Sequence, residues 1–131
     1  MEERLKAFLD ANAREPWRPG TVDCCMFLAS WAIWLGHPDP AQHLRGTYST
    51  DDGFRAIIRE AGGVVPVVDR CATSIGGKRL QRPVCGAIGV IGSHSNIDHQ
   101  LGAIFDGERW NVRFLNKVGH MTAAPLAIWS I

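Results

Sequence analysis

The sequence predicts an α+β fold in which N-terminal helices pack on one face of an antiparallel sheet. Two observations predict this fold. Apolar residues in the first half recur at helical spacing between turns that contain proline or glycine. The second half instead contains short β-prone runs separated by glycine-rich turns such as Asp106-Gly107. The chain has 131 residues, which fits a single domain spanning residues 1–131.

Two helices are expected before the first long turn region. The first covers residues 2–13, with its apolar side chains on one face. The second is expected to start near Cys24, with Thr21 or Asp23 as its N-cap, and to end at Gly36. Apolar residues occupy most of its circumference, which indicates a helix that is buried on most sides.

A third helix is expected from Asp51 to Ala61, with Thr50 as its N-cap and Gly62-Gly63 as its end. Asp51 lies in the first turn, where the helix dipole favours a negative charge. The pattern of residues 64–82 is ambiguous, so they receive no assignment. Strands are expected in the remaining part, and together they form an antiparallel sheet of four to six strands. The expected strand ranges are 87–91, 101–105, 110–115 and 127–131.

The composition excludes several classes of function. Hydrophobic residues make up 46% of the chain and the formal net charge is +1, without any block of like charge. Such a chain has no electrostatic footprint for nucleic acid, and no apolar run approaches the roughly 20 residues of a membrane span. The N-terminus is charged and lacks the apolar core of a signal peptide, so we expect synthesis and folding in a cytoplasm.

The four cysteines stand at positions 24, 25, 71 and 85, and their spacing fits neither a disulfide framework nor a zinc site. Free thiols are therefore expected, and no cofactor or metal. Cys24 and Cys25 both fall in the predicted first turn of the second helix, where the helix terminus lowers the pKa of a thiol. A histidine from the sheet would complete a thiolate–imidazolium pair. On residue type alone, a cysteine in an apolar helix is more often a small core residue.

Three segments carry a resemblance to the NlpC-type papain-like cysteine peptidases. The segment from Gly20 to Leu28 resembles their nucleophile motif, Asp-Cys-Ser-Gly-Leu/Phe-Val. The segment from Val84 to Ile91 resembles their Pro-Gly-Asp strand. The segment from Asp98 to Gly107 resembles their His-Val-Gly-Ile-Tyr strand. The resemblance implies a papain-like, NlpC-type fold and cleavage of cell-wall peptide bonds in the peptidase relatives.

Over nearly its full length the chain is similar to a family of short phage and prophage tail proteins related to those peptidases. The motifs that carry this similarity are Asp23-Cys24-Cys25, Gly36-His37-Pro38-Asp39-Pro40, Leu44-Arg45-Gly46-Thr47-Tyr48-Ser49-Thr50, Ala61-Gly62-Gly63 and Ala127-Ile128-Trp129. The similarity implies a virion protein at or near the phage tail tip. Its partners would then be other tail-tip or hub proteins, and peptidoglycan would be the substrate of an active form.

The family pattern assigns the catalytic roles. Cys24, directly after Asp23, takes the nucleophile position, and Cys25, in the slot usually held by serine, is the alternative. His99 is the candidate base, and Asn111 on the following strand is the candidate that orients it. Backbone N–H groups at the helix start, including that of Cys24, would form the oxyanion hole.

The base position departs from the family pattern. If Gly102 aligns with the glycine of His-Val-Gly, Gln100 occupies the histidine slot and His99 lies one residue earlier. A shift of one residue moves a strand side chain to the opposite face, and glutamine cannot take a proton at neutral pH. His94 and His120, both in predicted loops, are the remaining candidates.

Two functions therefore stay open. One is a tail-tip-associated cysteine hydrolase that acts on cell-wall peptide bonds during tail assembly or genome entry. The other is a catalytically degenerate NlpC-like structural component of the tail tip. The order of the motifs disfavours a third function, a generic α+β binding domain unrelated to phage. Whether the chain is an enzyme depends on which side chain faces Cys24.

Overall fold

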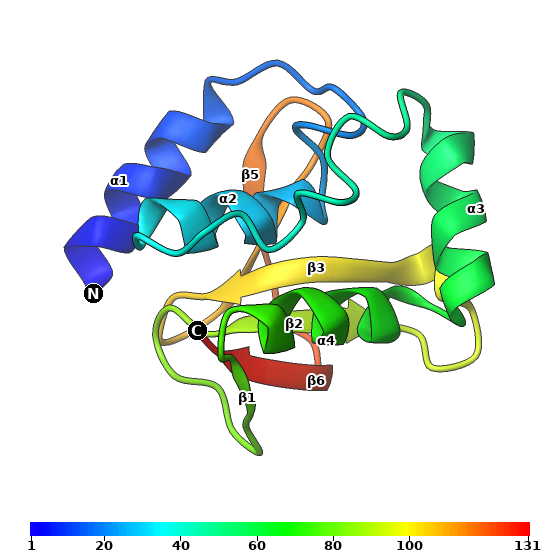
Figure 1. Cartoon of the computed structure of the whole chain (residues 1–131). Helices are drawn as coiled ribbons and strands as arrows, with labels where there is room; N and C mark the ends of the chain where they lie inside the picture. The colour runs from blue at the N-terminus through cyan, green and yellow to red at the C-terminus, as the bar shows by residue number, and fades with distance from the viewer.

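The helices precede most of the strands along the chain, as the sequence predicts (Figure 1). The structure is a computed structural model that describes residues 1–131. The helices are α1 (Glu2–Ala13), α2 (Met26–Trp34), α3 (Asp51–Ala61) and α4 (Val64–Ser74). The strands are β1 (Lys78–Arg79), β2 (Ile88–Gly92), β3 (Gln100–Phe105), β4 (Trp110–Arg113), β5 (Val118–Met121) and β6 (Pro125–Ser130), with a short 3₁₀ helix, η1 (Ile97–His99), before β3.

The six strands form one sheet in the order β1-β6-β2-β3-β4-β5, and every neighbouring pair is antiparallel. The predicted α+β class with an antiparallel sheet of four to six strands is confirmed. In the centre of the sheet Val90 of β2 pairs with Gly102 of β3. Farther along β3, Ile104 pairs with Asn111 of β4. These two registers decide which β3 and β4 side chains can approach the start of α2.

Helices α2, which was predicted, and α4, which was not, cover one face of the sheet. The largest group of buried apolar side chains joins α2 and α4 to β2, β3 and β6, with further members from α1 and α3. Trp31 and Trp129 are fully buried in it. Their indole N–H groups donate to the carbonyl of Gly86 and to the carboxylate of Asp69, so each ring packs in the core without an unpaired polar atom.

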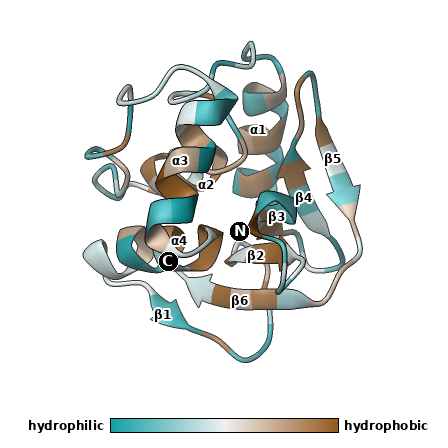
Figure 2. Cartoon of the chain, turned by 90° about the vertical axis from the view of Figure 1, so that its right-hand side faces the viewer, coloured by the Kyte–Doolittle hydropathy of each residue, from teal (hydrophilic) through white to brown (hydrophobic).

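The opposite face of the sheet carries a second, smaller apolar cluster without any helix residue: Ala87, Ile91, Ala103, Trp110, Val112 and Ile128. The hydropathy colouring in Figure 2 shows apolar stretches along β2, β4 and β6, which contribute residues to this cluster. Gly89 lies beneath Trp110, because a Cβ atom at position 89 would stand 2.6 Å from the indole ring. A single large ring from β4 therefore covers the middle of β2.

The segment left without assignment, residues 64–82, contains α4 and β1. Val64, Val68 and Ala72 of α4 are buried at a spacing of four residues, which is helical. Pro66 falls in the first turn, where its missing N–H leaves no hydrogen bond unmade. Gly63 precedes the helix at φ +134°, a conformation that favours glycine.

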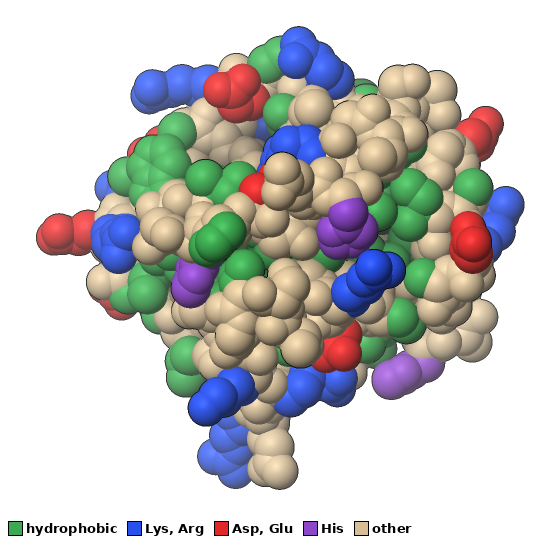
Figure 3. Space-filling model, in the orientation of Figure 1, with side chains coloured by type: hydrophobic (Ala, Val, Ile, Leu, Met, Phe, Trp, Pro, Cys, Tyr) green, Lys and Arg blue, Asp and Glu red, His purple; other side chains and the backbone are tan.

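The predicted loop around His120 is wrong. Residues 118–121 form β5, which pairs with β4 through Asn111 opposite His120. Glycine and histidine are weak strand formers, so the pattern hid this edge strand. On the molecular face drawn in Figure 3, basic and acidic side chains are interspersed. None of the helices combines the length and the apolar character that crossing a membrane requires.

Candidate functional site

Asp23 builds the turn that carries Cys24. Its Oδ1 accepts hydrogen bonds from the backbone N–H groups of Cys25 at 3.0 Å and Met26 at 2.8 Å. These are two of the N–H groups that a helix start leaves free, so Asp23 caps the turn that leads into α2. The backbone carbonyl of Asp23 also accepts from Phe27 at 2.9 Å, which is helical bonding. The helix starts at Met26, two residues after Cys24, and of the two predicted capping residues Asp23, not Thr21, accepts the N–H groups of this turn.

The second oxygen of Asp23 ties this turn to a distant loop. Oδ2 accepts from the N–H of Gly20 at 2.9 Å and from the hydroxyl of Tyr48 at 2.5 Å. Burial, followed by the charge of Asp23, raises the pKa of Tyr48, so its hydroxyl keeps its proton and remains a donor. Gly20 is required there, since its φ is +92° and a Cβ atom would lie 2.1 Å from the carbonyl oxygen of Tyr48. The buried Asp23 therefore fixes the backbone on both sides of Cys24.

Cys24 rests directly on β3. A Cβ atom at Gly102 would stand 2.7 Å from the carbonyl oxygen of Cys24 and 3.0 Å from Leu28, so only glycine permits this approach. Cys24 is partly exposed and lines a pocket of about 200 Å³, called here the Cys24 pocket. Its lining residues are Trp17, Asp23, Cys24, Asp51, Phe54, Arg55, Ile58, Asp98, Gln100 and Leu101.

The backbone N–H of Cys24 donates to no group of the chain. A thiol beside a free N–H at a helix start supplies a nucleophile and one oxyanion donor for acyl transfer. The third requirement of that chemistry is a base, and no histidine lines the Cys24 pocket.

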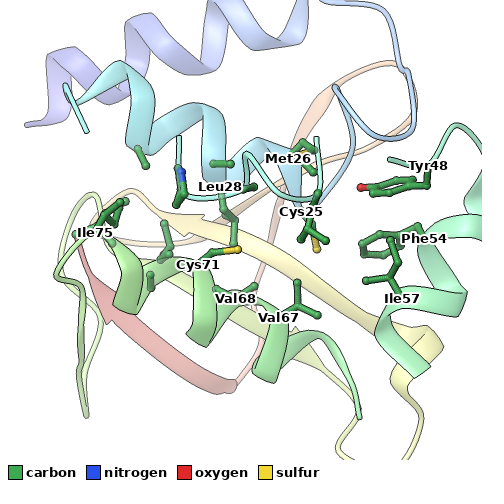
Figure 4. Close-up of a pocket in the computed structure, with 18 residues that line it drawn as sticks. Cys25, Met26, Leu28, Tyr48, Phe54, Ile57, Val67, Val68, Cys71 and Ile75 are labelled. Carbon is green, nitrogen blue, oxygen red and sulfur yellow. The ribbon is translucent and has the colours of Figure 1, made fainter. Parts of the chain in front are cut away.

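Cys25 points the other way, into the core. Figure 4 shows its sulfur, with that of Cys71, facing an apolar cavity between α2, α3 and α4. The cavity measures about 30 Å³, and 17 of its 18 lining residues are hydrophobic. The pKa of the Cys25 thiol is raised well above its ordinary value by the neighbouring Cys24 side chain first and by burial second. Cys25 therefore remains a thiol at neutral pH, and Cys24 is the cysteine that lines a pocket with charged side chains.

Gln100 is the polar β3 residue that lines the Cys24 pocket, and its amide is occupied at both ends. Its Oε1 accepts from the backbone N–H of Val64 at 2.9 Å, and its Nε2 donates to the carbonyl of Ser93 at 3.0 Å. The first bond satisfies one of the free N–H groups at the start of α4. With 8% of its surface exposed, Gln100 acts as a buried link between β3 and α4.

The three predicted catalytic residues are not brought together. His99 belongs to η1, is exposed, and has its Nδ1 3.4 Å from the amide of Asn96. Asn111 pairs with Ile104, four residues along β3 from Gln100, which corresponds to about 13 Å of strand. Neither residue lines the Cys24 pocket.

The other two histidine candidates also lie elsewhere. His94 is exposed in the loop after β2. His120 of β5 has its Nε2 3.9 Å from Asp106, and Asp106 in turn accepts from the side-chain amide of Asn111 at 3.1 Å. Asn111 thus serves a different group of polar side chains, at the opposite end of β3.

Sequence reasoning missed several residues of the Cys24 pocket. Asp51 and Arg55 come from the first turns of α3, and Asp98 comes from η1. The sequence indicates Asp51 only as a charge that suits a helix start, and no local signal relates it to Cys24. Tyr48 lies in a family motif, but its bond to Asp23 spans 25 residues and leaves no spacing pattern. No group of three or more His, Cys, Asp or Glu side chains is placed to hold a metal ion.

These observations define an α+β protein with a partly exposed thiol at a capped helix start and without a histidine beside it. The chain belongs to a domain family of unknown function, DUF6950, whose model matches residues 1–130. No curated protein and no solved structure matches the chain.

Proposed function

We propose that the chain is a structural component of a phage tail tip, with a papain-like, NlpC-type fold that has lost hydrolytic activity. The ordered motifs that resemble short phage tail proteins support the location. A capped helix start that carries Cys24 and rests on β3 at Gly102 supports the papain-like assignment. The loss of activity is carried by one observation, the environment of Gln100.

A cysteine hydrolase needs a base within hydrogen-bond reach of the thiol, directly or through one water. In the slot where the peptidase relatives have histidine, this chain has Gln100, which cannot take up a proton at neutral pH. Its amide is also committed to Val64 and Ser93, so it links two elements of the fold instead of serving the thiol. The side chain in the catalytic slot thus has a structural role.

A cell-wall hydrolase is the second candidate, and a specific observation favours it. Cys24 is partly exposed in a pocket that also contains charged side chains, and its backbone N–H has no partner in the chain. A substrate or partner protein could supply the missing base. The two candidates differ in what Cys24 does, and this difference can be measured.

The direct test is incubation of the full chain with purified peptidoglycan, followed by mass spectrometry of released peptides. We expect no release by the wild type and none by Cys24→Ala. Labelling with iodoacetamide at pH 6 is the second readout. We expect Cys24 to react no faster than a cysteine in a short unstructured peptide, because an unactivated thiol is almost entirely protonated at that pH. Release of peptides by the wild type but not by Cys24→Ala would overturn the proposal.

The location is tested in a phage or prophage that encodes the chain. Deletion of its gene is expected to block the formation of complete tails, and antibodies should detect the chain at the tail tip by electron microscopy. Complementation with Cys24→Ser should restore both tails and infectivity, since the thiol has no chemical task in a structural component. Normal tails with lost infectivity would instead identify the hydrolase, and normal infectivity after deletion would refute a structural role.

A further inference from the structure

A second polar groove lies far from the Cys24 pocket, between α1 and the edge of the sheet formed by β4 and β5. Helix α1 packs against β5 there (Figure 2). The groove measures about 440 Å³ and shares no lining residue with the Cys24 pocket. Its walls come from α1, from the turn after β3, and from single residues of β4 and β5. We call it the α1 groove.

Carboxylates dominate the α1 groove. Glu2 and Asp10 line it from α1, and Asp106 and Glu108 line it from the opposite turn. Lys6 is the only lysine or arginine among the lining residues. The whole chain carries a formal net charge of +1, whereas the residues that line this groove are predominantly acidic. A local excess of negative charge of this kind attracts cations.

The carboxylates are also largely free to bind a ligand. No ion pair within the chain involves Glu2, Asp10 or Glu108. Asp106 is held in place, since its Oδ1 accepts from the backbone N–H groups of Glu108 and Arg109 at 2.9 and 2.8 Å. The groove thus combines one fixed carboxylate with three unpaired ones.

The independent sign of a ligand is the amide of Asn111 in the groove. Asn111 is only 1% exposed, and its Nδ2 donates to the carbonyl of Ile104 and to Asp106. Because both partners are acceptors, the amide nitrogen must face them, and the amide oxygen Oδ1 then lies on the other side of the amide group. Oδ1 accepts no hydrogen bond from the chain. Every fully buried side-chain oxygen has a hydrogen-bond partner, so Oδ1 is not fully buried. Because Asn111 lines the α1 groove, a ligand in the groove can supply the donor that this oxygen lacks.

We propose that the α1 groove binds an arginine side chain presented by a partner protein. A guanidinium group carries positive charge for the carboxylates and N–H donors in a fixed fork, so one group can serve Asn111 and a carboxylate together. Lysine offers a compact point charge without that fork. Leu9, partly exposed in the same groove, gives the methylene stem of the arginine an apolar surface. This binding does not depend on any reactivity of Cys24.

The test is a titration of the ¹⁵N-labelled full chain with the peptide acetyl-Gly-Arg-Gly-amide, followed by NMR. We expect shifts confined to residues 2–10 and 106–111 and to His120, with saturation. The double variant Asp10→Asn/Glu108→Gln should bind about tenfold more weakly, because it removes two attractive charges. The control variant Glu3→Gln/Asp52→Asn changes the net charge equally outside the groove and should bind as the wild type does.

Asn111→Ala gives a second readout, once its spectrum shows that it is folded. It should weaken the arginine peptide while leaving the already weaker lysine peptide, acetyl-Gly-Lys-Gly-amide, nearly unaffected. Equal binding of the two peptides by the wild type would overturn the assignment to arginine. Equal loss of affinity in the groove variant and the control variant would overturn the site. A response to MgCl₂ without a response to the peptide would replace it with a cation site.

Discussion

Replacing Gln100 by alanine removes the side chain that joins β3 to the start of α4. The amide of Gln100 accepts from the N–H of Val64 at 2.9 Å and donates to the carbonyl of Ser93 at 3.0 Å. Val64 is completely buried, so water cannot replace the first bond, whereas Ser93 is partly exposed and can be hydrated. The two losses therefore differ in size.

A buried donor left without a partner costs about 1–3 kcal/mol, and a bond that water can replace costs about 0.5–1 kcal/mol. Together we expect Gln100→Ala to lower the free energy of unfolding by about 2–3 kcal/mol. For a domain of this size the melting temperature should then fall by about 6–12 °C.

The assay is urea unfolding followed by tryptophan fluorescence, with thermal unfolding as a second measure. Gln81→Ala is the matched control, since Gln81 is exposed and its loss should change stability by less than about 0.5 kcal/mol. Gln100→Glu keeps an acceptor for Val64 but loses the donor to Ser93, so it should fall between Gln100→Ala and the wild type. A Gln100→Ala protein as stable as the Gln81→Ala control would refute the capping role.

Three further predictions concern Asp23, Arg113 and Asp106. Asp23→Ala leaves four donors without their acceptor, so it should lower the free energy of unfolding in urea by at least about 3 kcal/mol. Tyr48→Phe removes only one of the four bonds and should cost about 1–2 kcal/mol, and equal effects of the two variants would contradict this role of Asp23. Arg113→Met removes the guanidinium that binds the carbonyls of Asn12 and Glu15, so it should lower the free energy of unfolding by about 2–4 kcal/mol. Arg113→Lys should restore little of this stability, because an ammonium group lacks the forked donors of a guanidinium. Full restoration by lysine would count against that geometry. Burial raises the pKa of Asp106, but hydrogen bonds from the backbone and Asn111 outweigh it, so the pKa lies below its ordinary value. The stability that Asp106 supplies is therefore present above about pH 4 and is lost as the pH falls through the lower folded value. Urea midpoints between neutral and acidic pH should show this loss in the wild type and a smaller one in Asp106→Asn.

The features that the sequence predicted best depend on neighbours in the chain. Asp23 caps the turn before α2 through N–H groups two and three residues away, and Thr50 caps α3 through Gly53 in the same manner. A short polar side chain before an apolar helix is enough to predict such bonds. Helix α4 shows the opposite case. Its valine-rich start with Pro66 reads as neither helix nor strand, and part of its N-terminal capping comes from Gln100, 36 residues later.

In the candidate site too, the local features were predictable from the sequence and the long-range ones were not. The position of Cys24 at a helix start is local, and it was predicted. Which side chain faces Cys24 depends on the register of β3, and a shift of one residue would exchange Gln100 for its neighbour His99. The register of β4 likewise places Asn111 opposite Ile104 and beside Asp106. Such registers are set by the packing of the whole sheet, which no spacing of residues in one strand reveals.

The attachment of α1 to β4 has a consequence for how the protein is made. The guanidinium of Arg113 holds the carbonyl at Asn12, 101 residues earlier in the chain. At a synthesis rate of about 5–20 residues per second, the ribosome adds Arg113 roughly 5–20 s after Asn12. During that interval α1 can pack on α2, through Phe8 against Phe27, but the carbonyl of Asn12 has no guanidinium to bind. The C-terminal end of α1 therefore reaches its final attachment only after β4 has been made.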